Sequence, residues 1–322
     1  MRKIRNYLIL LSFFVGSVAA QTYPTKPVRL IVGFPPGGSN DIVARVIAPK
    51  LGELLGGVQV VVENRAGANA TIAADFVAKA APDGYTLFLG STSSLVLSPH
   101  TYSKLSYDTL RDFAPITAIA MTPEAIAVHP ALPVTDLKSL TALAKQHPGK
   151  LDFASSGSGG LPHLAIELYK SLANINLQHV PFKGAGPAVT DLLGGHVQGI
   201  IMDFPAIQAQ MKSGKLRGVA LAAEKRIAQM PELPTTVEAG LPTLQAVNWF
   251  VIAAPAKTPA PVVARLYGSL IKAVSAPEIK DRFNAVGVEV LTQGSPAAAG
   301  DFLKDELARW GKVAKASGAR AD

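Results

Sequence analysis

Short apolar runs alternate with amphipathic helical patterns along the first third of the chain. The runs at 28–32, 58–62 and 85–89 are rich in β-branched residues and predict strands. The stretches between them, at 41–55 and 71–79, place apolar residues on one face and predict helices. Continuous apolar strands that alternate with helices are typical of a parallel sheet covered on both faces. This part of the chain is therefore predicted to be an α/β unit.

The same alternation starts again near residue 122. Apolar runs predict five more strands, at 125–128, 151–154, 178–180, 199–202 and 218–222. Helical patterns lie among them, at 136–146, 162–172, 187–193 and 206–213. After a last apolar run at 249–254 the chain is helical at 261–274 and 296–315, and Ser295 is the expected N-cap of the final helix.

Two α/β units followed by a helical tail predict a two-lobed α/β protein. We place lobe 1 at 21–121 together with 250–322, and lobe 2 at 122–249. This division requires the tail to pack against the first lobe. It also requires the chain to cross between the lobes twice, near 121–124 and near 247–250.

Residues 1–20 have the order of segments found in a secretory signal peptide. Basic residues near the start precede an apolar stretch at 7–18, and small residues follow at 18–20. The apolar stretch is short for a membrane span, and the alternative is a buried N-terminal helix. Export through this segment makes the periplasm the expected location, with Gln21 as the first residue of the exported chain.

Composition narrows the possible classes of function. The chain contains no cysteine, which excludes disulfides, thiol catalysis and Cys-based zinc sites, and its six histidines lack metal-ligand spacing. The formal charge is +8, and removing the first twenty residues, with three basic and no acidic side chains, leaves +5. No dense basic block stands beside aromatic residues, so no nucleic-acid partner is expected. We also expect no cofactor, no metal, no membrane insertion of the mature chain, and a monomer.

Three segments share a design that suits an anion. Each has a strand, a Gly- or Ser-rich turn and a helix start, at 33–41, 155–163 and 181–187. Glycines allow close backbone approach, and the first N–H groups of a helix are unpaired and partly positive. Such loops lie beyond the carboxyl ends of the strands, where α/β sheets bind ligands. The alternative interpretation is that they are ordinary connections between strands and helices.

The predicted ligand-binding residues lie at these strand ends. They are Phe34, Pro36, Gly37, Gly38, Ser39, Asp41, Ser91, Thr92, Ser155, Ser156, Gly157, Ser158, His163 and Asp203. His163 is expected either to bond a ligand or to cap its helix. Asp203 is expected either to meet a hydroxyl or amine of the ligand or to cap the helix that follows it.

An enzyme is the competing class of function. A serine near residue 155, His163 and Asp203 could be combined into a hydrolase triad, but their spacing places no base beside a nucleophile. The phosphate-loop, dinucleotide, nucleophile-elbow and zinc-protease motifs are all absent from the sequence. A binding protein is therefore predicted, and a secreted serine hydrolase remains the alternative.

A series of short motifs resembles one known family along essentially the whole mature chain. The ordered segments are Lys26–Val32 leading into Phe34–Gly38, Val62–Ala68, Pro82–Thr86, Ser155–Gly157, His163–Leu164, Val180–Gly184, Ala254–Pro255 and Thr258–Pro259. In this order they resemble the tripartite tricarboxylate transporter substrate-binding proteins, also called the Bordetella uptake gene family. Ala66 stands where the family usually has proline, and Phe182 where it often has tyrosine.

The resemblance implies a periplasmic binding protein of the type II Venus-flytrap architecture. It implies a small organic anion as ligand: a mono-, di- or tricarboxylate, an amino acid or an aromatic acid. One carboxylate would sit on the 34–41 loop, and the distal group would meet Ser155 to Ser158, His163 and Asp203. The expected partners are membrane permease subunits, and a ligand-loaded sensor for a signalling receptor is the alternative role.

Overall fold

The computed structural model describes residues 23–322, so the predicted signal peptide at 1–20 lies outside the described residues. The strands are β1 (Val28–Val32), β2 (Val60–Asn64), β3 (Thr86–Ser91), β4 (Phe113–Val128), β5 (Asp152–Ser155), β6 (Gln178–Pro181), β7 (Gly199–Asp203), β8 (Arg217–Leu221) and β9 (Val247–Pro255). The helices are α1 (Ser39–Leu54), α2 (Thr71–Ala78), α3 (Ser98–Thr101), α4 (Thr109–Asp112), α5 (Leu137–Gln146), α6 (Leu161–Ala173), α7 (Ala185–Leu193), α8 (Phe204–Lys212), α9 (Ala260–Ser275), α10 (Pro277–Ala285) and α11 (Pro296–Ser317). Two short helical turns, η1 (Ala68–Ala70) and η2 (Thr92–Leu97), complete the described elements.

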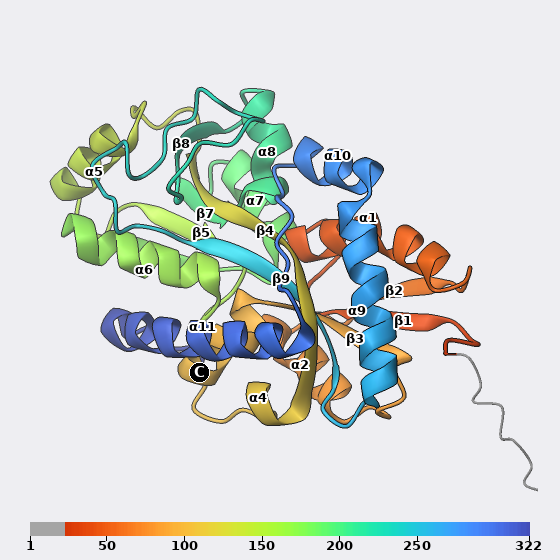
Figure 1. Ribbon diagram of the computed structural model, residues 1–322. Coiled ribbons are helices and arrows are strands. Elements are labelled where there is room, and N and C mark those ends of the chain that lie inside the picture. The colour runs from red at the N-terminus through yellow and green to blue at the C-terminus, as the bar shows by residue number, and fades with distance from the viewer. Residues whose placement is uncertain (1–22) are drawn as a thin grey trace, which may run out of the picture.

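The strands follow one path in the order β2-β1-β3-β9-β4-β7-β5-β6, and β8 pairs with β4. The first half of the molecule is built on β1, β2, β3 and β9, and the second half on β5 to β8, as Figure 1 shows. Strands β1, β2 and β3 pair in parallel, as do β5, β6 and β7. Strands β4 and β9 run antiparallel to their neighbours. The predicted parallel pairing is present in β1, β2 and β3, and the sheet as a whole is mixed because β4 and β9 are antiparallel.

Strand β4 joins the two halves. Residues 113–123 pair with β9 of the first half, and residues 124–128 pair with β7 and β8 of the second half. The return path enters β9 at Val247, directly after Ala246, whose N–H bonds the second-half residue Ala222. The lobe boundaries drawn at 121/122 and 249/250 fall inside these two strands, and the division at those residues stays a prediction.

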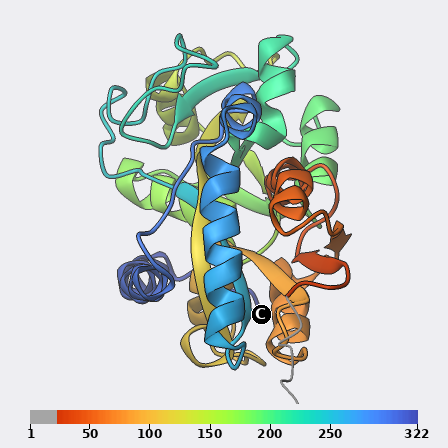
Figure 2. The same ribbon diagram turned by 45° about the vertical axis from the view of Figure 1, so that its right-hand side comes forward.

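Helices from the C-terminal part of the chain cover β4. Figure 2 shows α9 lying along β4 in the first half, where Leu266 and Leu270 join the core formed by Ile116 and Ile119. Helix α11 begins at Pro296, and Ser295 is its N-cap as predicted, since Ser295 Oγ accepts a hydrogen bond of 3.1 Å from the Ala298 N–H. It contacts β4, η2 and also α6, so the tail packs against both halves and not only the first.

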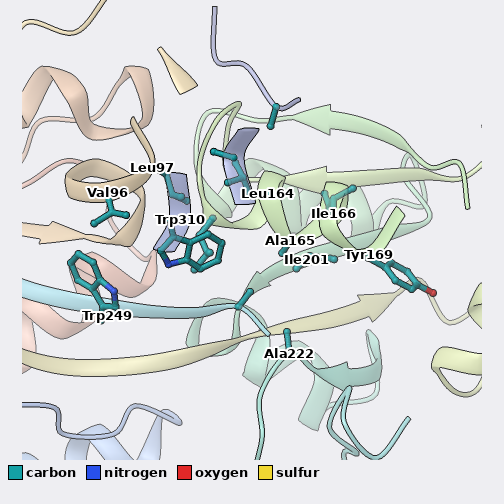
Figure 3. Packing of buried hydrophobic residues seen from close by; sticks show 14 of the residues in the cluster. Val96, Leu97, Leu164, Ala165, Ile166, Tyr169, Ile201, Ala222, Trp249 and Trp310 are labelled. Carbon is teal, nitrogen blue, oxygen red and sulfur yellow. The ribbon is translucent and has the colours of Figure 1, made fainter. Parts of the chain in front are cut away.

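Two tryptophans fix α11 to the junction between the halves. Trp249 on β9 and Trp310 on α11 both donate their indole N–H to Glu306, at 2.8 and 3.1 Å. Figure 3 shows Trp310 beside Leu97 of the first half and Leu164 of the second, and Trp249 belongs to the same buried cluster. Within residues 23–322 no helix has the length and apolarity needed to cross a membrane.

Candidate functional site

A pocket opens between the two halves at the carboxyl ends of the strands. Its lining contains the starts of three helices, at Ser39 and Asn40 of α1, Pro162 of α6 and Ala185 of α7, together with Asp203, which precedes α8. The empty space in it is about 430 Å³, a volume that includes solvent at its open mouth. Because helix starts present unpaired N–H groups and partial positive charge, their convergence favours an anion.

The loop between β1 and α1 is held by its own polar side chains. The Gly37 N–H donates to Asp41 Oδ2 at 3.0 Å, and Gly37 has φ +84°, a conformation that favours glycine. Asn64 on β2 donates to Asp41 Oδ1 at 2.9 Å and to the Phe34 carbonyl at 3.0 Å. Burial alone would raise the pKa of Asp41, but hydrogen bonds from Arg45, Gly37 and Asn64 hold it below its usual value. Asp41 therefore fixes the loop.

The loop between β5 and α6 rests on two stacked histidines. The rings of His163 and His179 lie 3.8 Å apart between centroids at an interplanar angle of 11°. His163 Nδ1 accepts from the Gly159 N–H at 2.9 Å, and His179 Nε2 lies 2.6 Å from Ser155 Oγ. Both rings therefore support the loop, and the His163 side chain bonds the turn just before its own helix.

Burial keeps both histidines neutral. It lowers the pKa of His163, and burial together with the neighbouring His163 lowers the pKa of His179 to about 3. Neutral His179 and buried Ser155 are within hydrogen-bond distance, like the serine and histidine of a hydrolase. Ser155 Oγ also donates to the Gly157 carbonyl at 3.0 Å and does not line the pocket.

The loop between β6 and α7 bonds to the second loop and approaches the first. The Gly184 N–H donates to the Ser156 carbonyl at 3.1 Å, and the Phe182 N–H donates to the Ser155 carbonyl at 3.0 Å. A Cβ atom added at Gly184 would lie 2.8 Å from Pro35 Cγ of the first half. The two halves therefore touch across the pocket at Gly184 and Pro35.

Asp203 lies at the centre of a buried polar cluster. Its carboxylate accepts hydrogen bonds from the Ser39 hydroxyl of the first half and from Asn248 Nδ2, which lies 3.1 Å from each oxygen. The side chain makes no capping bond to α8, so it serves the cluster instead of the helix start. Burial raises the pKa of Asp203, while hydrogen bonds from its neighbours act in the opposite direction.

Glu124 stands directly beside Asp203 on the neighbouring strand. The two residues are partners in the β4–β7 register, and Glu124 is completely buried. Burial and the charge of Asp203 raise the pKa of Glu124 well above its usual value. No donor among the described residues reaches either Glu124 oxygen, whereas Asp203 receives several. Two adjacent buried carboxylates disfavour ionisation of the pair, and Glu124, which has no donor, is the more strongly affected of the two.

The pocket gathers part of the predicted residue set. Six of the predicted residues line it: Phe34, Pro36, Gly38, Ser39, Ser156 and Asp203. A second hollow beside it contains Gly157 and Ser158 and extends to 66–70 of the first half. The remaining predicted residues support the loops or the strand ends: Gly37, Asp41, Ser91, Thr92, Ser155 and His163. Whether any of these residues contacts a ligand stays a prediction.

Three further polar residues line the pocket: Asn40, Ser93 and Asn248. The serines and threonine at 91–93 were expected at this strand end, whereas Asn40 and Asn248 were not in the predicted set. Ser93 Oγ accepts from the Leu161 N–H at 3.0 Å, so a first-half hydroxyl meets the start of α6. Asn40 stands next to a predicted residue and could have been included. Asn248 lies 45 residues after Asp203, in a strand that gives no local sign of a site.

Two α/β halves with a pocket of helix starts between them define a solute-binding protein of the periplasmic type. The family model for the tripartite tricarboxylate transporter family receptor matches residues 43–319. This chain belongs to that family. Its members are substrate-binding proteins and not enzymes.

Individual relatives agree with this assignment. Protein BugT of Bordetella pertussis is 37% identical over 304 residues, covering 94% of this chain and 93% of BugT. A structure from R. palustris with adipate is 34% identical at a TM-score of 0.89, covering 92% of this chain and 99% of that chain. MatC from Rhodopseudomonas palustris with bound malate is 31% identical at a TM-score of 0.85, covering 91% and 100%. The predicted family, the two-lobed binding-protein fold and the substrate-binding function are confirmed, and the hydrolase alternative is not retained.

Proposed function

We propose that this chain captures a small organic carboxylate in the pocket between its halves and closes around it. The halves would move about β4 and β9 as lobes 21–121 with 250–322, and 122–249. In the open form the helix starts face solvent, and in the closed form the bound anion bridges both halves. Membrane permease subunits would then recognise the closed form.

The convergence of helix starts on one pocket is the observation that supports this proposal most strongly. Three helices begin at its lining, and none of the lining residues is a lysine, arginine or histidine. A carboxylate would therefore be held by backbone N–H groups and by the Asn40 and Ser156 side chains. Adipate and malate, named with two of the similar structures, are both dicarboxylates.

Contacts across the pocket describe the closed form of the proposed cycle. Ser39 bonds Asp203, Ser93 bonds the Leu161 N–H, and Gly184 lies against Pro35. Each contact joins the first half to the second and would be lost on opening. A ligand that adds hydrogen bonds to both halves would shift the equilibrium toward closure by the difference in its affinity for the two forms.

Location follows from the family and from the predicted export segment. Family membership supports the periplasm, and we propose that residues 1–20 are removed during export.

A thermal-shift screen of ligand-stripped protein tests the proposed function. The protein is unfolded in guanidinium, refolded, and heated with adipate, malate, succinate, aspartate, citrate or benzoate, with putrescine and glucose as controls. A carboxylate at 100 times its Kd should stabilise the fold by about 2.7 kcal/mol. A midpoint raised by carboxylates alone is expected. No shift with any carboxylate, or an equal shift with the controls, would overturn the proposal.

A further inference from the structure

The pocket contains hydrogen-bond acceptors that a plain dicarboxylate cannot use. Asn248 donates through Nδ2 to both oxygens of Asp203, which fixes the orientation of its amide because a carboxylate only accepts. Asn248 Oδ1 is consequently directed away from Asp203. This oxygen is buried and has no donor among the described residues, and Asn248 lines the pocket. Buried polar atoms in native sites normally have partners, so Oδ1 lacks a donor that a ligand could supply.

Asp203 adds a buried negative charge to the same wall. It is 8% exposed, lines the pocket, and forms no ion pair with any Lys, Arg or His among residues 23–322. Its neighbours Ser39 and Asn248 donate hydrogen bonds to it but carry no positive charge. A buried carboxylate without a countercharge is costly, and a cationic ligand group placed beside it would lower that cost.

The pocket also contains a hydrogen-bond donor that has no acceptor among the described residues. Asn40 Nδ2, in the first turn of α1, is buried and has no acceptor among the described residues. Together with the N–H groups at the helix starts it suits a ligand carboxylate. The lining therefore offers donors for an anion and, at Asp203 and Asn248, acceptors for a positively charged donor.

We propose that the ligand is an amino acid, and that Asp203 and Asn248 Oδ1 are the specificity determinants that bind its ammonium group. This inference rests on the proposed capture of a carboxylate and names the substrate class. A hydroxyl group could satisfy Asn248 Oδ1 but would leave the charge of Asp203 without compensation. A plain dicarboxylate would leave Oδ1 unpaired and bring a further negative charge toward Asp203.

Matched ligand sets test the proposal by titration calorimetry on refolded, ligand-free protein. Each set keeps the carbon chain and changes one group: succinate, L-malate and L-aspartate form the first, and glutarate, L-2-hydroxyglutarate and L-glutamate the second. Adipate, 2-hydroxyadipate and L-2-aminoadipate form the third. In the set that binds best, the amino member should bind about 30-fold or more tightly than the plain dicarboxylate. The hydroxy member should lie between them.

Variants then locate the preference at Asp203. Asp203→Asn keeps the size of the side chain and removes its charge, so it should abolish most of the preference for the amino member. Asp191→Asn makes the same change on α7, outside the pocket lining, and should keep the preference. Loss of the preference in Asp203→Asn alone supports the proposal, and an equal preference in both folded variants overturns it.

The ligand comparison on the unaltered protein decides the proposal even where a variant fails to fold. Equal or tighter binding of the plain or hydroxy member overturns the assignment of an amino acid, while carboxylate capture still stands. Absence of binding by every member of every set, together with the absence of any thermal shift, overturns both.

Discussion

Replacing Gly184 by alanine should prevent full closure of the two halves. Gly184 has φ +109° and ψ 175°, a region essentially restricted to glycine, and it precedes α7 in the second half. An added Cβ would lie 2.8 Å from Pro35 Cγ and 2.9 Å from Pro35 Cδ of the first half. Ordinary contacts between carbon atoms are about 3.5–4.0 Å, so the loops must separate by several tenths of an ångström or more.

The expected magnitude follows from the cost of overpacking. Inserting a methyl group into a packed contact costs about 1–3 kcal/mol. The steric part of this cost applies only to the closed form, because Pro35 and Gly184 separate on opening. Binding should therefore weaken about 5- to 140-fold, since about 1.4 kcal/mol is a tenfold change.

Titration calorimetry with the carboxylate of largest thermal shift measures the loss, and small-angle X-ray scattering measures closure. Ligand should reduce the radius of gyration of the unaltered protein and reduce it less in Gly184→Ala. Gly214→Ala is the control, because Gly214 also has positive φ, at +72°, but no atom stands within 4 Å of its added Cβ. Unweakened binding and full compaction in Gly184→Ala would refute the reasoning, as would an equal loss of affinity in Gly214→Ala.

Four further predictions concern the site loops and the export segment. Gly38→Val should abolish detectable binding in a folded protein, because Gly38 lines the pocket and its extended backbone accepts a side chain; unchanged affinity by calorimetry would remove this loop from the site. Lys183→Met should weaken binding by less than about tenfold, whereas loss of a direct ion pair costs about 2–5 kcal/mol, and a larger loss would mean that a cationic side chain anchors the ligand. His179 has a folded pKa of about 3 against 6.5 in the unfolded chain, so the unfolded chain takes up the proton first and stability falls as pH drops below 6.5. The contribution of His179 to this slope is at most about 1.4 kcal/mol per pH unit, because one ring binds one proton. Urea unfolding between pH 6.5 and about pH 5 should therefore show a shallower slope for His179→Gln than for the unaltered protein; equal slopes would contradict the assignment. Exported protein should begin at Gln21, as intact mass would report, and a periplasmic form that retains residues 1–20 would contradict the predicted cleavage.

Local chemistry allowed the loops of the site to be predicted from the sequence. The loop glycines at 37 and 157 adopt positive φ in the structure, and the helices predicted from 41 and 162 begin at Ser39 and Leu161. The rule that ligands bind beyond the carboxyl ends of parallel strands brought these loops together. Such features depend on neighbouring residues only, and the sequence displays them directly.

Long-range pairing could not be predicted in the same way. Strand β4 begins at Phe113, but the sequence predicts a strand only from residue 125, because Pro115 and Pro123 interrupt the pattern. Pro115 is accommodated where the register of β4 and β9 shifts, between Pro115 and Thr117, and Pro123 pairs with Val247 at the start of β9. The result is one long antiparallel strand in place of a crossover unit, which also explains the mixed sheet.

The polar cluster at Asp203 also depends on long-range pairing and could not be predicted from the sequence. Glu124 meets Asp203 only because β4 and β7 are antiparallel partners in this register. Asn248 arrives from the start of β9, and Ser39 from the other half of the molecule. The sequence offers one sign of this cluster: Glu124 is an acidic residue within an apolar run, with Pro123 before it and Ala125 after it.

The position of a bound carboxylate in a crystal of the complex tests the central claim most directly. Crystals would be grown from refolded protein with the carboxylate that gives the largest thermal shift. We expect one carboxylate group between the halves, within about 3.2 Å of backbone N–H groups at the start of α1 or of the loop at Ser156, with no lysine or arginine in contact. A carboxylate bound outside this pocket, or held chiefly by Lys183, would contradict the account.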